Sequence, residues 1–311
     1  MDLFQGISMQ GVLTAAIRTA APILLASMGG LFSARSGIII LSLEGYMLMG
    51  AFTGFLGSVF FGSAYIGALT GMLGGMAMAL IFAFLAINAR ANQTVGGVAI
   101  NIFSLGLTSY LLAVIFGVGQ RPYGVATFPR ISIPLLSEIP YLGGILFNHS
   151  LIVYIAFLTV PLVWYVVYRT PAGLMIRATG EHPRAVETLG GNVIKIRYLC
   201  MMAAGALAGL GGAALSIGLM GQFMEGITAG RGFIALAALI FGKFTPVGAM
   251  LAALLFGFAD GLQLRMQTAE SVIPYQLLAM LPYLLTMIAL SSFSKKSSAP
   301  AALGKPYTRQ G

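Results

Sequence analysis

The sequence predicts an all-α, polytopic transmembrane bundle of eight to ten spans, and three features of its composition support that fold class. Hydrophobic residues make up 58% of the chain and charged residues only 8%, whereas soluble domains carry about 25% charged residues. The apolar residues fall into runs of about 20, the length that a helix needs to cross the hydrocarbon core of a bilayer. Glycine, at 41 of 311 residues, is well above its usual level of about 7%. We therefore expect a single transmembrane domain over residues 1–311.

Eight apolar runs follow one another along the chain. They cover residues 11–32, 37–60, 64–88, 96–119, 149–168, 199–220, 246–264 and 273–292. A further apolar piece, 232–242, lies between Arg231 and Lys243. It is too short for an ordinary span, which predicts a broken or re-entrant helix. Glycines four residues apart, such as Gly205 and Gly209, let helix backbones approach closely and predict a compact bundle.

Two interrupted segments in the two halves of the chain resemble each other. The letters RSG at 35–37 open the run GIIILSLEGYMLMGAF, and RGF at 231–233 opens GFIALAALIFGKFTPVGAM. Each has an arginine and a glycine at its start, a short apolar piece, an interruption and a second piece. Paired segments of this kind are typical of transporters built from inverted repeats, whose pathway passes the breaks. The sequence therefore predicts an inverted repeat with broken helices.

The basic residues are spread unevenly. Of the 17 Lys and Arg residues, five lie in segment 169–198 and four in the tail 293–311, whereas segment 120–148 has two. Short loops rich in Lys and Arg stay on the cytoplasmic side during insertion. We therefore predict that the loop and the tail are cytoplasmic and that 120–148 faces out, while the side of the N-terminus stays open. Topology thus accounts for the net charge of +9, and no nucleic-acid partner is expected.

Motifs for enzymatic chemistry are missing. No stretch matches G-x-x-x-x-G-K-[ST], so the chain has no P-loop of its own. One cysteine and two histidines that lie far apart in the sequence make neither a metal cluster nor a Ser-His-Asp site. We expect no catalytic residue, no metal and no cofactor on this chain, and a primary pump acting alone is excluded.

Few polar residues interrupt the apolar runs, and each needs a reason because unpaired polar groups are costly in a membrane. We assign to a translocation pathway the residues at or near the breaks: Ser42, Glu44, Gln93, Asn101, Arg231 and Gly232. Structural roles remain open as alternatives. Glu44 could pair with Arg35 or Arg18 or cap the N-terminus of a broken helix, and Asn101 could serve helix packing.

Three other residues are expected to have local structural roles. Asp260 lies five residues before Arg265, near the end of a span, and should form an interfacial ion pair with it. Glu225 and Arg231 bracket the segment 221–231 and are expected to pair with each other. Cys200, the single cysteine, is expected to be a packing residue.

Several segments resemble the permease subunits of bacterial ABC importers of the branched-chain amino acid, simple sugar and nucleoside type. They are FSARSGIIILSLEGYMLMGAF, ANQTVGGVAINIFSLGLTSYL, GEHPRAVETLGGNVIKIRYLCMMAAGALAGLGGA and TAGRGFIALAALIFGKFTPVGAMLAALLFGFADGLQLRMQ. The last is the closest and resembles the nucleoside branch most. The resemblance implies a multi-pass permease of the bacterial inner (cytoplasmic) membrane, surrounded by lipid. It also implies three partners: a second permease subunit, as a homodimer or a pair, cytoplasmic ABC ATPase subunits that bind the ATP, and an extracytoplasmic solute-binding protein or lipoprotein.

Within segment 169–198, the letters EHPRAVETL at 181–189 favour a short helix. Pro183 suits its first turn, the acids are expected near its N-terminus, and Asn192 can cap the next helix. This helix looks like the coupling helix that seats in an ATPase groove; a solvated connector is the alternative. The residues assigned to coupling are Gly180, Glu181, Arg184, Ala185, Glu187, Gly190 and Gly191.

The resemblance implies import of a nucleoside or a related small polar solute. A simple sugar such as ribose or galactose is the alternative within the family. An ion-coupled secondary transporter is the alternative class, because an acid such as Glu44 within the apolar sequence could serve a proton-coupled carrier.

The predicted orientation can be tested by cysteine labelling in intact cells. With Cys200 replaced by Ser, a membrane-impermeant maleimide should modify a cysteine at position 130 and leave one at position 182 unmodified. The opposite pattern would reverse the assigned sides.

Overall fold

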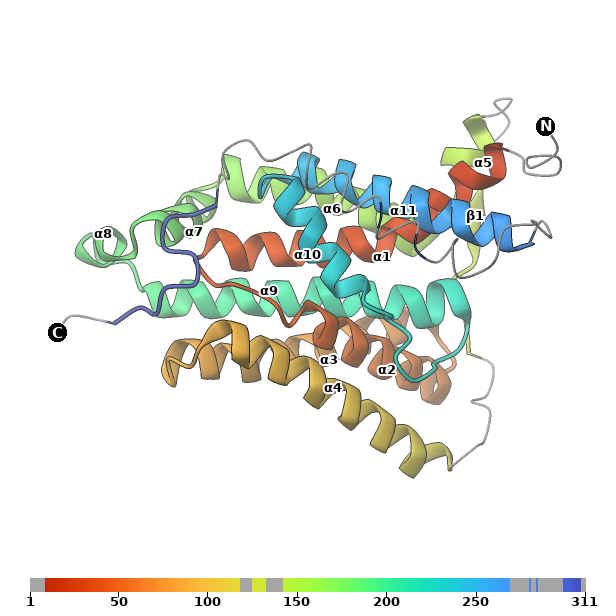
Figure 1. The fold of residues 1–311 in the computed structure, drawn as a ribbon, viewed down its shortest axis with the longest axis horizontal. Helices are drawn as coiled ribbons and strands as arrows, with labels where there is room; N and C mark the ends of the chain where they lie inside the picture. The colour runs from red at the N-terminus through yellow and green to blue at the C-terminus, as the bar shows by residue number, and fades with distance from the viewer. Residues whose placement is uncertain are drawn as a thin grey trace.

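The computed structural model describes residues 9–117, 125–132, 142–268, 280, 284 and 299–308. It is an elongated bundle of helices, as Figure 1 shows. Seven helical segments are long and apolar enough to cross a membrane: Met9–Arg35, Leu43–Phe61, Ala64–Asn88, Gln93–Phe116, Leu151–Arg169, Val193–Met220 and Pro246–Met266. The predicted polytopic helical fold is confirmed. The predicted run 273–292 lies almost entirely outside the described residues.

The long helices are α1 (Met9–Arg35), α2 (Leu43–Phe61), α3 (Ala64–Ala83), α4 (Gln93–Phe116), α6 (Leu151–Arg169), α9 (Val193–Ala213) and α11 (Pro246–Thr268). Two π-helical stretches, η1 (Phe84–Asn88) and η2 (Ala214–Met220), extend α3 and α9. The shorter helices are α5 (Leu142–Leu146), α7 (Pro171–Glu181), α8 (Pro183–Thr188) and α10 (Arg231–Phe241). A small antiparallel ladder of β1 (Arg130–Ser132) and β2 (Asn148–Ser150) is the one departure from an all-α fold among the described residues.

The core of the bundle is a glycine seam between α2, α3 and α9. Gly50, Gly71, Gly75, Gly205 and Gly209 bring the three backbones so close that a Cβ on Gly209 would overlap the carbonyl oxygen of Gly71. Small residues permit this approach where lipid provides no hydrophobic drive for association. The predicted compact packing is confirmed, and α9 lies at its centre beside α1, α2 and α3 (Figure 1).

Residue contacts fix the directions of the central helices. Between α1 and α9, Gly29 contacts Ala204 and Pro22 contacts Gly211. Between α2 and α9, Gly50 contacts Gly209 and Gly54 contacts Ala213. Between α1 and α10, Ser27 contacts Ala235 and Gly30 contacts Leu239. Helix α1 is therefore antiparallel to α9, α2 is parallel to α9, and α10 is parallel to α1. It follows that α2 and α10 are antiparallel to each other. This opposition is the relation expected of corresponding broken helices in an inverted repeat.

The second predicted span starts later than expected. Residues 38–41 are extended, and α2 begins only at Leu43 instead of near residue 37. Gly37 adopts φ +91° where the chain leaves α1, a conformation that glycine tolerates without steric cost. The second break is the segment 221–230, after which α10 covers only 11 residues. Both predicted breaks are thus present.

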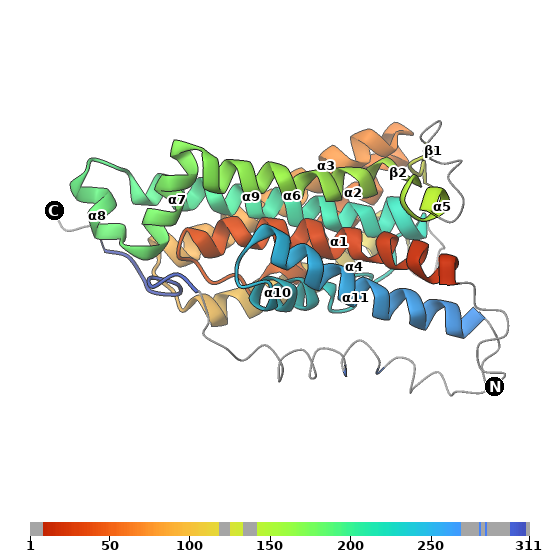
Figure 2. The ribbon, with the colours of Figure 1, turned by 90° about the horizontal axis from the view of Figure 1, so that it is seen from above.

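The two ends of the bundle have different contents. Helices α7 and α8 and the tail 299–308 lie at one end, which we call the inner end, and α5 with the β1–β2 ladder lies at the other, the outer end (Figures 1 and 2). Helix α1 begins at the outer end, as Figure 2 shows. The names follow the orientation predicted from charge.

The glycine seam predicts opposite effects for two glycine substitutions. Gly209→Ala forces backbones apart and should destabilise the protein by roughly 1–3 kcal/mol. Gly106→Ala, on α4, places its methyl group in open space and should be neutral or stabilise by up to about 1 kcal/mol, because alanine favours helix over glycine. Unfolding midpoints of the purified variants in detergent check this. Equal midpoints would show that the seam is not tightly packed.

Candidate translocation and coupling sites

The carboxylate of Glu44 joins the two broken helices. Glu44 lies in the first turn of α2, and its oxygens accept hydrogen bonds from the start of α10. Oε1 accepts from the Thr228 hydroxyl at 2.6 Å and from Gly230 N–H at 2.8 Å, and Oε2 accepts from Gly232 N–H at 2.6 Å. An acid at this position satisfies free amides and interacts favourably with the helix dipole. Of the roles considered for Glu44, capping of a broken helix is the one that the structure bears out.

The backbones of α2 and α10 touch where the carboxylate binds. A Cβ on Gly232 would overlap the backbone nitrogen of Glu44, so only glycine fits there. Since the helices are antiparallel, their N-termini meet head to head. The positive ends of two helix dipoles therefore converge on one acid, and this arrangement needs the negative charge that Glu44 supplies.

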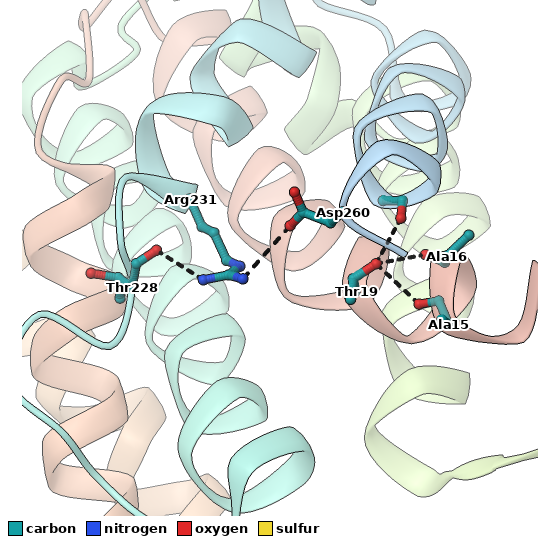
Figure 3. A network of polar contacts seen from close by, with 7 residues as sticks. Ala15, Ala16, Thr19, Thr228, Arg231 and Asp260 are labelled. Carbon is teal, nitrogen blue, oxygen red and sulfur yellow. Dashed lines mark hydrogen bonds and ion pairs between the residues drawn. The ribbon is translucent and has the colours of Figure 1, made fainter. Parts of the chain in front are cut away.

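Arg231 extends this network to α11. Its guanidinium lies 3.6 Å from the Asp260 carboxylate, with the side chains 19% and 11% exposed, and donates to the Thr228 carbonyl at 3.4 Å. Figure 3 shows Thr228, Arg231 and Asp260 in this row, with Thr19 of α1 nearby. Thr228 connects the two charged groups, because its hydroxyl contacts Glu44 and its carbonyl contacts Arg231.

Two predicted ion pairs are therefore wrong. Asp260 pairs with Arg231 and not with Arg265, because the chain returns from α10 into α11 and brings the two side chains together. For the same reason Arg231 does not pair with Glu225, which is exposed in the preceding loop.

Arg35 is engaged elsewhere and does not pair with Glu44. Its guanidinium donates to the Phe244 carbonyl at 2.6 Å and to the Tyr168 hydroxyl at 3.1 Å. These contacts fix the inner end of α1 against α6 and the segment that follows α10.

Two side chains of α4 hold the extended segment after α1. Gln93 Oε1 accepts from Ile39 N–H at 2.8 Å. Asn101 accepts from Gly45 N–H at 2.8 Å and donates to the Leu41 carbonyl at 2.9 Å. Irregular backbone at membrane depth requires such partners, because lipid offers none. Glu44, Gly232 and Arg231 therefore form one group, whereas Gln93 and Asn101 support the segment leading into it.

Unpartnered hydroxyl groups surround the start of α2. Ser42 Oγ, Tyr46 OH and Ser104 Oγ are buried and have no hydrogen-bond partner among the described residues. Buried polar atoms are nearly always paired, so each exception calls for an explanation. Ser42 was among the predicted pathway residues, whereas Tyr46 and Ser104 were not. The spacing of Ser104 and Thr108 after Asn101 on α4 was the available signal.

The short helix predicted at 181–189 is present as α8, with Pro183 in its first position. Gly190 follows it at φ +82°, and Asn192 Oδ1 caps α9 by accepting from Lys195 N–H at 3.0 Å. The acids differ from expectation, since none lies in the first turn of α8. Helix α7 was not predicted, although Thr170 and Pro171 give the usual start signal: the Thr170 hydroxyl accepts from Gly173 N–H at 3.1 Å.

The residues assigned to coupling divide into two groups. Arg184, Ala185 and Gly190 are exposed, and Leu189, which the sequence analysis did not assign, is 87% exposed beside them. The other group makes internal contacts. A Cβ on Gly180 would overlap the carbonyl oxygen of Arg35, and one on Gly191 would lie 2.6 Å from Val186.

The tail 299–308 lies along α7 and α8, as Figure 2 shows, and contacts Gly180, Glu181 and Glu187. Glu181 Oε2 accepts from Ala301 N–H at 3.1 Å, and the Gly180 carbonyl accepts from Ala302 N–H at 2.9 Å. The Tyr307 hydroxyl donates to Glu187, and its ring stacks on the Arg197 guanidinium at 5.7 Å. The tail thus fixes the inner end of the permease.

The Glu44 contacts predict a selective loss of stability in one variant. Glu44→Gln keeps the side-chain shape but removes one acceptor and the charge at the start of α10. We expect a loss of about 2 kcal/mol, since hydrogen bonds to charged groups contribute about 1.5–3 kcal/mol. Glu225→Gln, in the exposed part of the same loop, is the matched control. Equal unfolding midpoints for the two variants would contradict this role of Glu44.

Comparison with known proteins agrees with this architecture. Residues 12–290 match the family described as branched-chain amino acid transport system / permease component. The guanosine ABC transporter permease protein NupQ of Bacillus subtilis is 41% identical, with 99% of each chain covered. The nucleoside permease NupC of Lactococcus lactis is 36% identical over 93% of this chain and 94% of its own, and TsgC13 of Haloferax volcanii, named for glucose transport, is 34% identical over 96% and 98%.

One solved structure shares the fold. An inward-facing ABC transporter of the metal-chelate type aligns with a TM-score of 0.51 and 15% identity, covering 91% of this chain and 85% of the other. Permeases of the matched family work with ATPase and solute-binding partners, so the alternative of an ion-coupled secondary transporter is set aside. The chain belongs to the branched-chain amino acid transport system permease family and is a multi-pass membrane permease of an ABC transporter.

Proposed function

We propose that this permease imports a nucleoside, with a purine nucleoside such as guanosine as the first candidate. The observation that carries the proposal is the 41% identity to a guanosine permease over 99% of both chains. The 34% identity to a permease named for glucose keeps a simple sugar as the second candidate. Both solutes are small, neutral and rich in hydroxyl groups, which suits a path lined by polar groups that carry little net charge.

The pathway that we propose passes the junction of α2 and α10. It includes Ser42, Glu44, Gln93, Asn101, Arg231 and Gly232, together with the unpartnered hydroxyls of Tyr46 and Ser104. In this structure the junction is closed, because Glu44 binds the start of α10 and the hydroxyls are buried. Separation of α2 from α10 would expose these hydroxyls and the amides of α10 to a passing solute. Such contacts are weak and exchangeable, which suits transport.

Three partners complete the transporter in this proposal. A second permease subunit, the same chain or a paired one, completes the path. ATPase subunits bind the exposed residues of the inner end, Arg184, Ala185, Leu189 and Gly190. A solute-binding protein or lipoprotein delivers the nucleoside at the outer end.

Reconstitution tests the solute. Proteoliposomes that contain the permease, its ATPase and its binding protein should accumulate labelled guanosine when ATP is supplied on the side of the membrane that carries the ATPase. A protonophore should leave uptake unchanged, and excess unlabelled glucose should not compete. Uptake of glucose without uptake of guanosine would make the sugar the correct solute.

The exposed group at the inner end predicts an ATPase contact. Ala185→Trp and Leu189→Asp should each lower the amount of co-purified ATPase at least about tenfold, the effect of about 1.4 kcal/mol, without changing the unfolding midpoint of the isolated permease. The first adds bulk to a small contact, and the second places a charge at an exposed apolar tip. Leu189→Met is the control and should retain the ATPase. Normal co-purification of both test variants would mean that α8 is a solvated connector.

A further inference from the structure

A polar cavity at the outer end has no role in the transport path described above. Its volume is about 300 Å³, and it lies between the start of α1, the β1–β2 ladder and the end of η2. Arg18, Arg130 and His149 are the ionisable residues among those that line it, and no acid is among them. Three basic side chains from three elements therefore surround one small cavity.

Neither arginine has a counter-charge among the residues that the structure describes. Within the described part of the chain, Arg18 and Arg130 make no ion pair, and no hydrogen bond of their guanidinium groups is found. Arg18 is half-buried, in the third turn of α1. A guanidinium at a membrane boundary normally pairs or is hydrated, because an unpaired charge is costly away from water. Two guanidinium groups that no described acid neutralises give the cavity a positive potential.

His149 supplies a second and independent observation. Its side chain is only 1% exposed, yet its Nδ1 atom has no hydrogen-bond partner. The other ring nitrogen, Nε2, lies 2.7 Å from the Ile145 carbonyl and therefore carries a proton. His149 is one of the residues that line the cavity, and its Nδ1 is left as a buried polar atom that protonation would turn into a donor.

The surrounding backbone holds His149 firmly. In the β1–β2 ladder, Ile131 lies opposite His149 and Arg130 lies opposite Ser150. The Tyr154 hydroxyl accepts from His149 N–H and donates to the Ile131 carbonyl, both at 3.3 Å. The cavity is thus a built site on a fixed scaffold and not a gap between mobile side chains.

We propose that this cavity binds an oxyanion, a phosphate or carboxylate group, between Arg18, Arg130 and the Nδ1 atom of His149. Arginine presents a planar fork of donors that matches the oxygens of either group. The bound anion would neutralise both guanidinium groups and pair the orphaned Nδ1. Binding at this site is a function beyond nucleoside transport. The bound oxyanion could be a free anion or the headgroup of a phospholipid.

The titration of His149 should report binding. Burial lowers the pKa of His149, and the charges of Arg18 and Arg130 lower it further, against the effect of the hydrogen bond to the Ile145 carbonyl. The imidazole is therefore neutral at neutral pH in the empty cavity. A bound oxyanion favours the charged imidazolium, so it should raise this pKa. By linkage, binding should strengthen as the pH falls from the pKa of His149 in the occupied site to its lower pKa in the empty site, and should be weakest above both, where His149 is neutral in either state.

Selective histidine labelling gives a direct readout, since the chain has only two histidines. We would record histidine NMR signals of the permease in maltoside detergent, which contains no phosphate, and assign His149 with the His182→Gln variant. Phosphate or acetate should raise the pKa of His149 in a saturable manner relative to chloride at equal ionic strength. Arg130→Gln should raise the half-saturating anion concentration at least about tenfold, equivalent to about 1.4 kcal/mol. Arg130→Lys should retain most of the anion-induced rise in the pKa of His149.

The same measurement distinguishes a lipid headgroup from an anion in solution, and both from a cavity that binds no oxyanion. If the pKa of His149 is already raised in phospholipid nanodiscs without added anion, the oxyanion is a lipid headgroup. If it rises only after phosphate is added, the oxyanion comes from solution. No response to phosphate, acetate or phospholipid, or an equal response in Arg130→Gln, would overturn the proposal.

Discussion

The contact between Glu44 and the start of α10 is the constraint on which the centre of this permease depends. Two helices that begin within the bundle point their N-termini at each other, and this arrangement exposes amides and positive dipole ends away from water. One carboxylate satisfies Gly230, Gly232 and Thr228 together. Because Gly232 lies against the backbone of Glu44, the same point also sets the spacing of the two helices. A small shift there therefore changes hydrogen bonding and packing at once.

The remainder of the bundle keeps that contact in place. The glycine seam locks α2 and α3 onto α9, Asn101 and Gln93 hold the extended segment before α2, and Asp260 holds Arg231 from α11. Each of these restraints acts on only one of the two broken helices. The rigid parts are thus the supports on either side, and the junction between them is a small polar contact. This distribution suits the proposed path, which has to open without unfolding the bundle.

The sequence predicted those features that arise locally. Apolar runs predicted the spans, the short piece after Arg231 predicted a broken helix, and Pro183 with Gly190 predicted the short helix α8. The start of α2 was placed too early because IIIL at 38–41 is as apolar as a helix. Its extended form depends on side chains of Gln93 and Asn101, more than 50 positions away. Likewise, the partner of Asp260 was wrong because sequence distance favours Arg265, whereas the turn between α10 and α11 brings Arg231 closer. Leu189 was missed because an exposed leucine cannot be told from a buried one by residue type.

The tail has a consequence for the order of biogenesis. Residues 301–307 bind Gly180, Glu181 and Glu187 and cover Arg197, so the inner end obtains its full set of contacts only after the residues beyond position 300 have been synthesised. A chain still under synthesis has inserted its helices but lacks this support beneath α7 and α8. A chain cut short near residue 300 would therefore lack the contacts that the tail makes with α7, α8 and Arg197.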